Sequence, residues 1–77
     1  MPHVLVKLYA GRPDALKHRL AREVSRAVTS VLGLPDESVS VAIQDVDASR
    51  WAEEVYKPDV LGNEPLLYKR PGDDPGA

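Results

Sequence analysis

The chain has 77 residues, the length of one small domain, and it contains no cysteine, which excludes both a disulfide framework and a thiolate metal site. Its two histidines, His3 and His18, lack partners at metal-binding spacing, so no metal is expected. The formal net charge of −2 lacks the basic excess of nucleic-acid binders. Lys7 interrupts the apolar N-terminal stretch, and no apolar run approaches the about 20 residues of a membrane span. We expect one cytoplasmic domain over residues 1–77, without a nucleic-acid or membrane partner.

The N-terminal half predicts a strand followed by a long helix. Residues 2–9 alternate in character and are rich in β-branched side chains, which predicts a strand whose even-numbered residues face the core. A glycine-containing turn follows. Apolar residues then recur at helical spacing, which predicts a helix over residues 13–32 that begins at Pro13 and stops at Gly33.

Residues 39–46 alternate again and predict a second strand. A strand, a crossover helix and a strand form a βαβ unit with parallel strands and a right-handed crossover, and we assign the chain to the α+β class. A short helix is expected at about 48–56, with Pro58 as its end signal. A loop over 59–65 and a loose tail over 70–77 are expected to follow.

This unit is too small to bury a sufficient core by itself. A chain of this length buries only about 60% of the surface that its unfolded form exposes. A two-stranded sheet also leaves two strand edges exposed. We therefore expect a homodimer in which the sheet continues as four strands across the subunits. A hexamer stays open, because Leu5 and Tyr9 make the second face of the sheet partly apolar.

Pro2 is the residue that points most directly to chemistry. Initiator methionine is normally removed before a small residue, and loss of Met1 would leave a secondary amine at the start of the first strand. Ordinary α-amino groups have pKa values of about 7.7–8.0, near the pH at which a general base works best. Most prolines after Met1 have no such role, so the interpretation depends on context. Here a strand follows immediately, and Arg12 lies in the loop before the helix.

Arg12 and Trp51 are the candidates for binding a substrate. Arg12 can hold a carboxylate through two parallel hydrogen bonds, although composition alone fits a solvated loop residue better. Trp51, the only tryptophan, fits either a core or interface anchor or an apolar wall that excludes water from a site. Ser40 lacks the histidine and aspartate arrangement of a nucleophile, so only a hydrogen-bonding role is considered for it.

The order of these features resembles the 4-oxalocrotonate tautomerase family. The resemblance covers the first strand, the helix and the second strand. The segment after them is similar to the slightly longer, typically dimeric members of the group. The motifs that carry it are Met1-Pro2-His3, Gly11-Arg12, Arg22-Glu23-Val24, Ser38-Val39-Ser40-Val41, Trp51 and the ending Leu67-Tyr68-Lys69-Arg70-Pro71-Gly72.

The resemblance implies a βαβ protomer whose dimer has a four-stranded sheet with two helices on one face. It implies Pro2 as general base and acid, Arg12 as the group that binds the substrate carboxylate, and Trp51 as a wall of the site. Ser40 stands where the family's best-known member has a second arginine that polarises the substrate carbonyl. A hydroxyl there favours a simple 2-keto acid or its enol, such as an arylpyruvate, with Ser40 donating to the enolate oxygen. No cofactor is expected, because the carbonyl itself is the electron sink.

Two other functions remain open from the residues. The first is a non-enzymatic association module, because short βαβ units also serve only to bring chains together. The second is a hydratase, dehalogenase or decarboxylase on the same scaffold, with Glu53 or Glu54 near Trp51 as the carboxylate that such reactions need. The sequence favours keto–enol tautomerisation by Pro2 over both.

Overall fold

The computed structural model describes residues 1–72 and divides the chain into two compact units, Met1–Asp45 and a unit that begins at Val46, which are described separately. The prediction of a single domain stays a prediction. The first unit holds two strands, one long helix and a 3-10 turn. These elements are β1 (His3–Tyr9), α1 (Asp14–Leu32), η1 (Asp36–Ser38) and β2 (Ser40–Val46), whose last residue starts the second unit.

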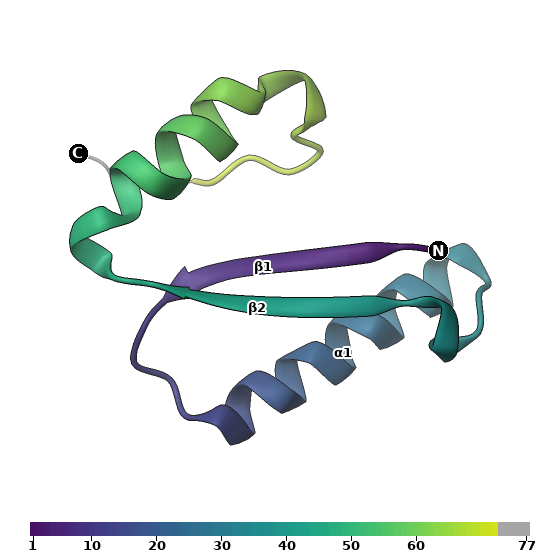
Figure 1. Cartoon of the computed structure of the whole chain (residues 1–77). Coiled ribbons are helices and arrows are strands. Elements are labelled where there is room, and N and C mark those ends of the chain that lie inside the picture. Colours follow the sequence, from purple (N-terminus) through teal and green to yellow (C-terminus); the bar gives the residue numbers. More distant parts are fainter. Residues whose placement is uncertain (73–77) are drawn as a thin grey trace. The chain divides into compact units, whose positions relative to one another are not determined.

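Strands β1 and β2 lie side by side as a parallel pair, and α1 runs along one face of this sheet (Figure 1). The backbone N–H of Ser40 donates to the carbonyl of Pro2 at 3.1 Å, which aligns the starts of the two strands. Each strand is one residue shorter than expected at its N-terminal end, because Pro2 and Val39 precede the regular ladder. The predicted βαβ unit of the α+β class is confirmed.

The two faces of β1 differ as the alternation predicts. Val4, Val6 and Leu8 are half-buried, whereas Leu5 keeps 48% and Tyr9 keeps 40% of its surface exposed. Side chains of successive strand residues point to opposite faces. The even-numbered residues therefore share the covered face of the sheet, and the two large exposed side chains share the other.

Helix α1 begins one residue later than predicted. Pro13 is not its first residue but its N-cap, with an extended backbone (φ −70°, ψ 154°). Its carbonyl accepts hydrogen bonds from the N–H groups of Leu16 at 3.1 Å and Lys17 at 3.3 Å. Proline costs nothing here, because its missing N–H would have no partner at a helix start. Asp14, the first helical residue, places a carboxylate where the helix dipole favours one.

The helix ends at Gly33, as predicted. Gly33 adopts a left-handed backbone (φ 68°, ψ 42°), which is readily accessible only to glycine. The carbonyl of Thr29 accepts hydrogen bonds from the N–H groups of Gly33 at 2.9 Å and Leu34 at 3.1 Å. These bonds satisfy the last turn and direct the chain back toward β2.

One buried polar contact fixes the connection between α1 and β2. Ser25 is buried in the middle of the helix, and its hydroxyl donates to the carboxylate of Asp36 at 2.7 Å. A hydrogen bond to a charged acceptor contributes more to stability than a hydrogen bond to a neutral acceptor.

We expect Ser25→Ala to lower the free energy of unfolding by roughly 1–2 kcal/mol, because Asp36 loses this partner. Thermal denaturation followed by circular dichroism measures the effect as a drop of several degrees in Tm. Ser30 lies on the same helix and is exposed, so Ser30→Ala is the matched control and should change little. Equal melting of both variants would contradict the role of the Ser25–Asp36 contact.

The second unit is helical over a longer stretch than expected. It contains the 3-10 turn η2 (Ala48–Arg50), the π-helix η3 (Ala52–Val60) and the 3-10 helix η4 (Leu61–Leu66). The predicted helix at 48–56 is therefore present but continues, and the predicted loop over 59–65 is wrong. Pro58 lies inside η3 rather than ending it. In an α-helix its ring would meet the carbonyl four residues earlier, and the wider π-helical turn relieves that clash.

Two side-chain contacts hold the ends of this helical segment. Asp47 accepts hydrogen bonds from the N–H and the hydroxyl of Ser49 at 3.0 and 2.9 Å, and they lower the pKa of Asp47. Arg70 donates to Glu64 at 2.6 Å, which lowers the pKa of that carboxyl. Both carboxylates therefore stabilise the fold at pH values above the ordinary pKa of their residue type. This contribution is lost as the pH falls through their lowered pKa values in the folded protein.

The apolar core of the described chain is small. Within residues 1–72 the only buried apolar side chains are Val46 and Val55. The apolar stripe predicted for the helix is only partly covered, because Leu16 is 47%, Val31 is 82% and Leu32 is 59% exposed. A chain that leaves so many large apolar side chains in water is expected to cover them by association.

Within residues 1–72 no helix combines the length with the apolar character that a membrane crossing requires. The same residues bring together no group of three His, Asp or Glu side chains that could hold a metal ion. Of the predicted tail over 70–77, residues 70–72 form neither helix nor strand, and the rest lies outside the described residues.

Candidate active site

Pro2, His3 and Ser40 meet where both strands begin. The parallel register places the first residue of β2 beside the residue that precedes β1, and the carbonyl of Pro2 accepts the Ser40 N–H at 3.1 Å. Pro2 itself is half-buried. The sheet therefore fixes the position of the Pro2 nitrogen, which would move freely at a loose chain end. A general base needs such a fixed position relative to its substrate.

A side-chain contact joins the same two strand ends. Nδ1 of His3 lies 2.7 Å from the hydroxyl oxygen of Ser40. The sequence alone indicated no histidine partner for Ser40. The alternating pattern of the two strands was consistent with this contact. His3 and Ser40 are each the first residue of a strand, and both face away from Val4 and Val41. The contact becomes visible only once the parallel register is known.

Arg12 lies at the opposite end of β1. Its Nη1 donates to the carbonyl of Tyr9, the last strand residue, at 3.1 Å. The seven residues of β1 separate it from Pro2, and they rise by about 3.3 Å each, or about 23 Å in all. No side chain spans this distance. Within one chain, the structure therefore does not bring Arg12 together with Pro2 and Ser40.

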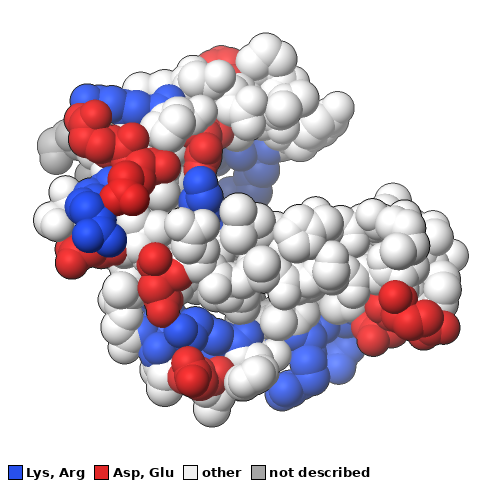
Figure 2. Space-filling model, in the orientation of Figure 1, with Lys and Arg blue, Asp and Glu red and all other residues white. Residues whose placement is uncertain are grey.

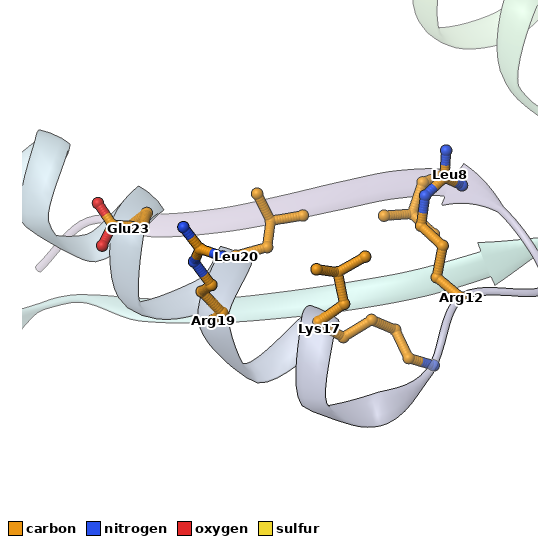
Figure 3. Close-up of a pocket in the computed structure, with 7 residues that line it drawn as sticks. Leu8, Arg12, Lys17, Arg19, Leu20 and Glu23 are labelled. Carbon is orange, nitrogen blue, oxygen red and sulfur yellow. The ribbon is translucent and has the colours of Figure 1, made fainter.

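Arg12 lines a groove of about 310 Å³ between β1 and the first half of α1. Leu8, Leu16 and Leu20 supply the apolar part of its surface. Charged side chains from the loop and the helix surround these leucines: Arg12, Lys17, Arg19 and Glu23. Figure 3 shows Arg12 near the end of the strand and Glu23 farther along the helix, with Leu20 between them.

The charge around this groove favours an anion. Lys17 is already paired, since its ammonium group lies 2.8 Å from Asp45 and 3.4 Å from Asp14. The Asp45 contact raises the pKa of Lys17, so the pair persists through neutral pH and is lost only above the ordinary lysine range. Glu23 is likewise paired with Arg26 at 2.7 Å. Among the described residues that line the groove, Arg12 and Arg19 are the cations without an ion pair to a carboxylate.

Elsewhere charges of both signs are interspersed. On the face shown in Figure 2, basic and acidic side chains lie next to one another in mixed groups, and broad areas between these groups carry no charge. In the second unit Glu53 pairs with Lys57, and Glu54 pairs with Arg50 at 2.6 Å. Both carboxylates that were candidates for activating water are therefore engaged in ion pairs, Glu53 within η3 and Glu54 with the last residue of η2.

Trp51 lies between η2 and η3 and is half-buried. Its backbone N–H donates to the carbonyl of Ala48, which closes the 3-10 turn. It belongs to the second unit, whereas Pro2, Arg12 and Ser40 belong to the first. Its place in a common site therefore stays a prediction.

The chain also matches known proteins. Residues 2–56 fit the sequence model of a family described as tautomerase enzymes. A probable tautomerase of Xylella fastidiosa is 43% identical over 72 residues, which cover 94% of this chain and 88% of the relative. Tautomerase PptA of Pectobacterium carotovorum subsp. carotovorum is 32% identical over 73 residues, covering 94% of this chain and 96% of the relative. A probable tautomerase of Bacillus cereus is 36% identical over 52 residues, covering 68% of this chain and 85% of the relative. The chain therefore belongs to the tautomerase family.

Proposed function

We propose that this protein is an isomerase that interconverts the keto and enol forms of a small 2-keto acid of the arylpyruvate kind. The observation that carries the proposal is Pro2, held by its carbonyl against Ser40 at the start of the sheet, in a chain whose family match runs from residue 2. After loss of Met1, the nitrogen of Pro2 is a secondary amine that can take and return a proton.

The reaction needs only one acid–base group and a place for the negative charge. The amine of Pro2 takes the proton of the enol hydroxyl or of the carbon next to the carbonyl, and returns it to the other atom. Between the two steps the charge lies on an enolate oxygen. The hydroxyl of Ser40 is the donor proposed for that oxygen, and the carbonyl group serves as the electron sink, so the proposed reaction uses no cofactor.

The proposed active unit is a homodimer, because a twofold axis would bring Pro2 of one protomer close to Arg12 of the other. Both strands of the sheet lie at an edge, and the Arg12 groove opens beside β1. If β1 of a second protomer pairs with this edge about a twofold axis, the two copies of β1 run antiparallel. The start of each strand then lies beside the end of the other. Pro2 of one protomer then lies beside the groove that holds Arg12 of the partner subunit.

Ser40 sets the proposed substrate class. A 2-keto acid has one carboxylate, for which the cationic groove offers Arg12, and one carbonyl oxygen, for which the start of β2 offers a hydroxyl. A second carboxylate would find no cation from Ser40, whose hydroxyl lies 2.7 Å from Nδ1 of His3. The leucines of the groove suit an apolar group on the third carbon, and Trp51 is proposed as a further apolar wall.

A panel of 2-keto acids and their enols, followed by ultraviolet absorbance, tests the activity. Titration of the N-terminal amine by ¹⁵N NMR tests the catalyst independently. A pKa below the ordinary α-amino range, with selective alkylation of Pro2 by an electrophilic α-halo ketone, supports the enzyme. An ordinary value, with no turnover across the panel, would favour the association module instead.

We expect Arg12→Ala to raise KM for acidic substrates by about 5- to 150-fold, because a charge-assisted hydrogen bond to the carboxylate is lost. Neutral ketones of matched size should be affected little. Steady-state kinetics on an acid and its methyl ester measure the difference. Arg22 is an exposed arginine on α1 and lies outside the groove, so Arg22→Ala is the matched control. Equal losses for acid and ester would contradict the carboxylate role.

A further inference from the structure

We infer that His3 is a positioning residue that donates its Nδ1–H to Ser40 and thereby turns the Ser40 hydroxyl proton toward the substrate oxygen. This inference rests on the proposed tautomerisation and adds a residue to it. The carrying observation is the 2.7 Å contact between the ring and the hydroxyl at the strand ends beside Pro2.

A serine hydroxyl has one proton and two lone pairs, so its use depends on its neighbours. If Nδ1 of His3 is the acceptor, the Ser40 hydroxyl donates its proton to the ring, and only its lone pairs face the substrate. If Nδ1 donates, the proton stays available. A developing enolate oxygen is itself an acceptor, so only the second arrangement stabilises it.

The surroundings of the pair favour a fixed hydroxyl. The Ser40 backbone is anchored, because its N–H donates to the Pro2 carbonyl at 3.1 Å. His3 is anchored as the first residue of β1. A donor from the ring also polarises the hydroxyl, since hydrogen bonds in a chain strengthen one another. The pair thus presents a directed donor at the sheet end where the Pro2 nitrogen lies.

Substitutions at His3 separate donation from acceptance. Asparagine can place an N–H near the position of Nδ1, whereas an ionised aspartate can only accept and takes the Ser40 proton for itself. We expect Ser40→Ala and His3→Asp each to lower kcat about tenfold with little change in KM, because the hydrogen bond forms in the transition state. His3→Asn should stay within about twofold of the native enzyme.

Two further measurements make the test specific. The same changes at His18, an exposed histidine on α1, are the matched controls for altered charge and should leave kcat unchanged. The double variant His3→Asp/Ser40→Ala should be no slower than Ser40→Ala, because both changes remove one interaction. ¹⁵N NMR of the native ring should show a protonated Nδ1 whose signal shifts in Ser40→Ala.

Three results would overturn the inference: an Nδ1 without a proton at the working pH, additive losses in the double variant, or equal kcat for His3→Asp and His3→Asn. Each leaves the proposed function intact if turnover still depends on Pro2. Conversely, if no 2-keto acid is turned over, the proposed function fails, and the NMR readout alone still decides whether His3 donates to Ser40.

Discussion

Replacing Pro2 by alanine should lower kcat by about 10²- to 10⁴-fold, the usual contribution of a general acid–base group, while the assembly state and the melting temperature stay unchanged. Alanine is small enough to allow removal of Met1, so the variant still begins with an amine. That amine is primary, differs in basicity and lacks the ring that orients the lone pair. The measurement is steady-state turnover of the best 2-keto acid in the panel, on protein whose N-terminus is verified by mass spectrometry.

A chain that keeps one residue before Pro2 is the sharper control. Its Pro2 nitrogen is an amide, which is not basic, while every side chain of the site stays the same. This form should be inactive, and removal of the added residue by a specific aminopeptidase should restore activity. Full turnover with a blocked Pro2 would exclude the amine mechanism, whatever the outcome of the alanine variant.

The elements of the first unit could be predicted because the sequence patterns that specify them involve only neighbouring residues. Alternation in β1, helical spacing in α1 and a glycine at its end depend only on neighbours in the chain. Gly33 shows the principle, since the left-handed backbone that ends the helix follows from one residue type. Pro13 was misplaced by one position, because an N-cap and a first helical residue suit proline almost equally.

The second unit could be predicted less well, for a physical reason. Proline normally ends an α-helix. Around Pro58, however, the backbone widens into the π-helix η3, and the helical segment continues. Whether a chain makes that adjustment depends on what its other residues pack against, and Val55 is buried in this segment. Such packing is set by residues far away in sequence, so the local pattern favoured a stop where the structure has none.

The candidate site was predictable by residue type but not by geometry. Pro2 and Arg12 were identified as complementary chemistry, yet a seven-residue strand separates them in one chain. Ser40 was identified as a weak donor, yet its contact with His3 depends on strand register. A sequence indicates which groups can react. Register and subunit symmetry decide which of them meet.

Mixed dimers should reveal that each site is shared between two chains. If Pro2 acts with Arg12 of the partner subunit, a dimer of one Pro2→Ala chain and one Arg12→Ala chain has one site with both defects and one intact site. Purified through a different tag on each chain, it should recover about half of the native activity per dimer. The assay is run well below the native KM, where Arg12→Ala sites contribute little.

The reciprocal mixture gives the opposite expectation. A native chain paired with a chain that carries both changes has one defect in each shared site, so that dimer should be nearly inactive. Sites made within one chain would reverse the two results, with half activity for the native/double pair and almost none for the single/single pair. Light scattering on the same samples checks that both mixtures are dimers. A monomer that keeps full activity would contradict the shared site, because β1 would then have no partner strand to bring Pro2 and Arg12 together.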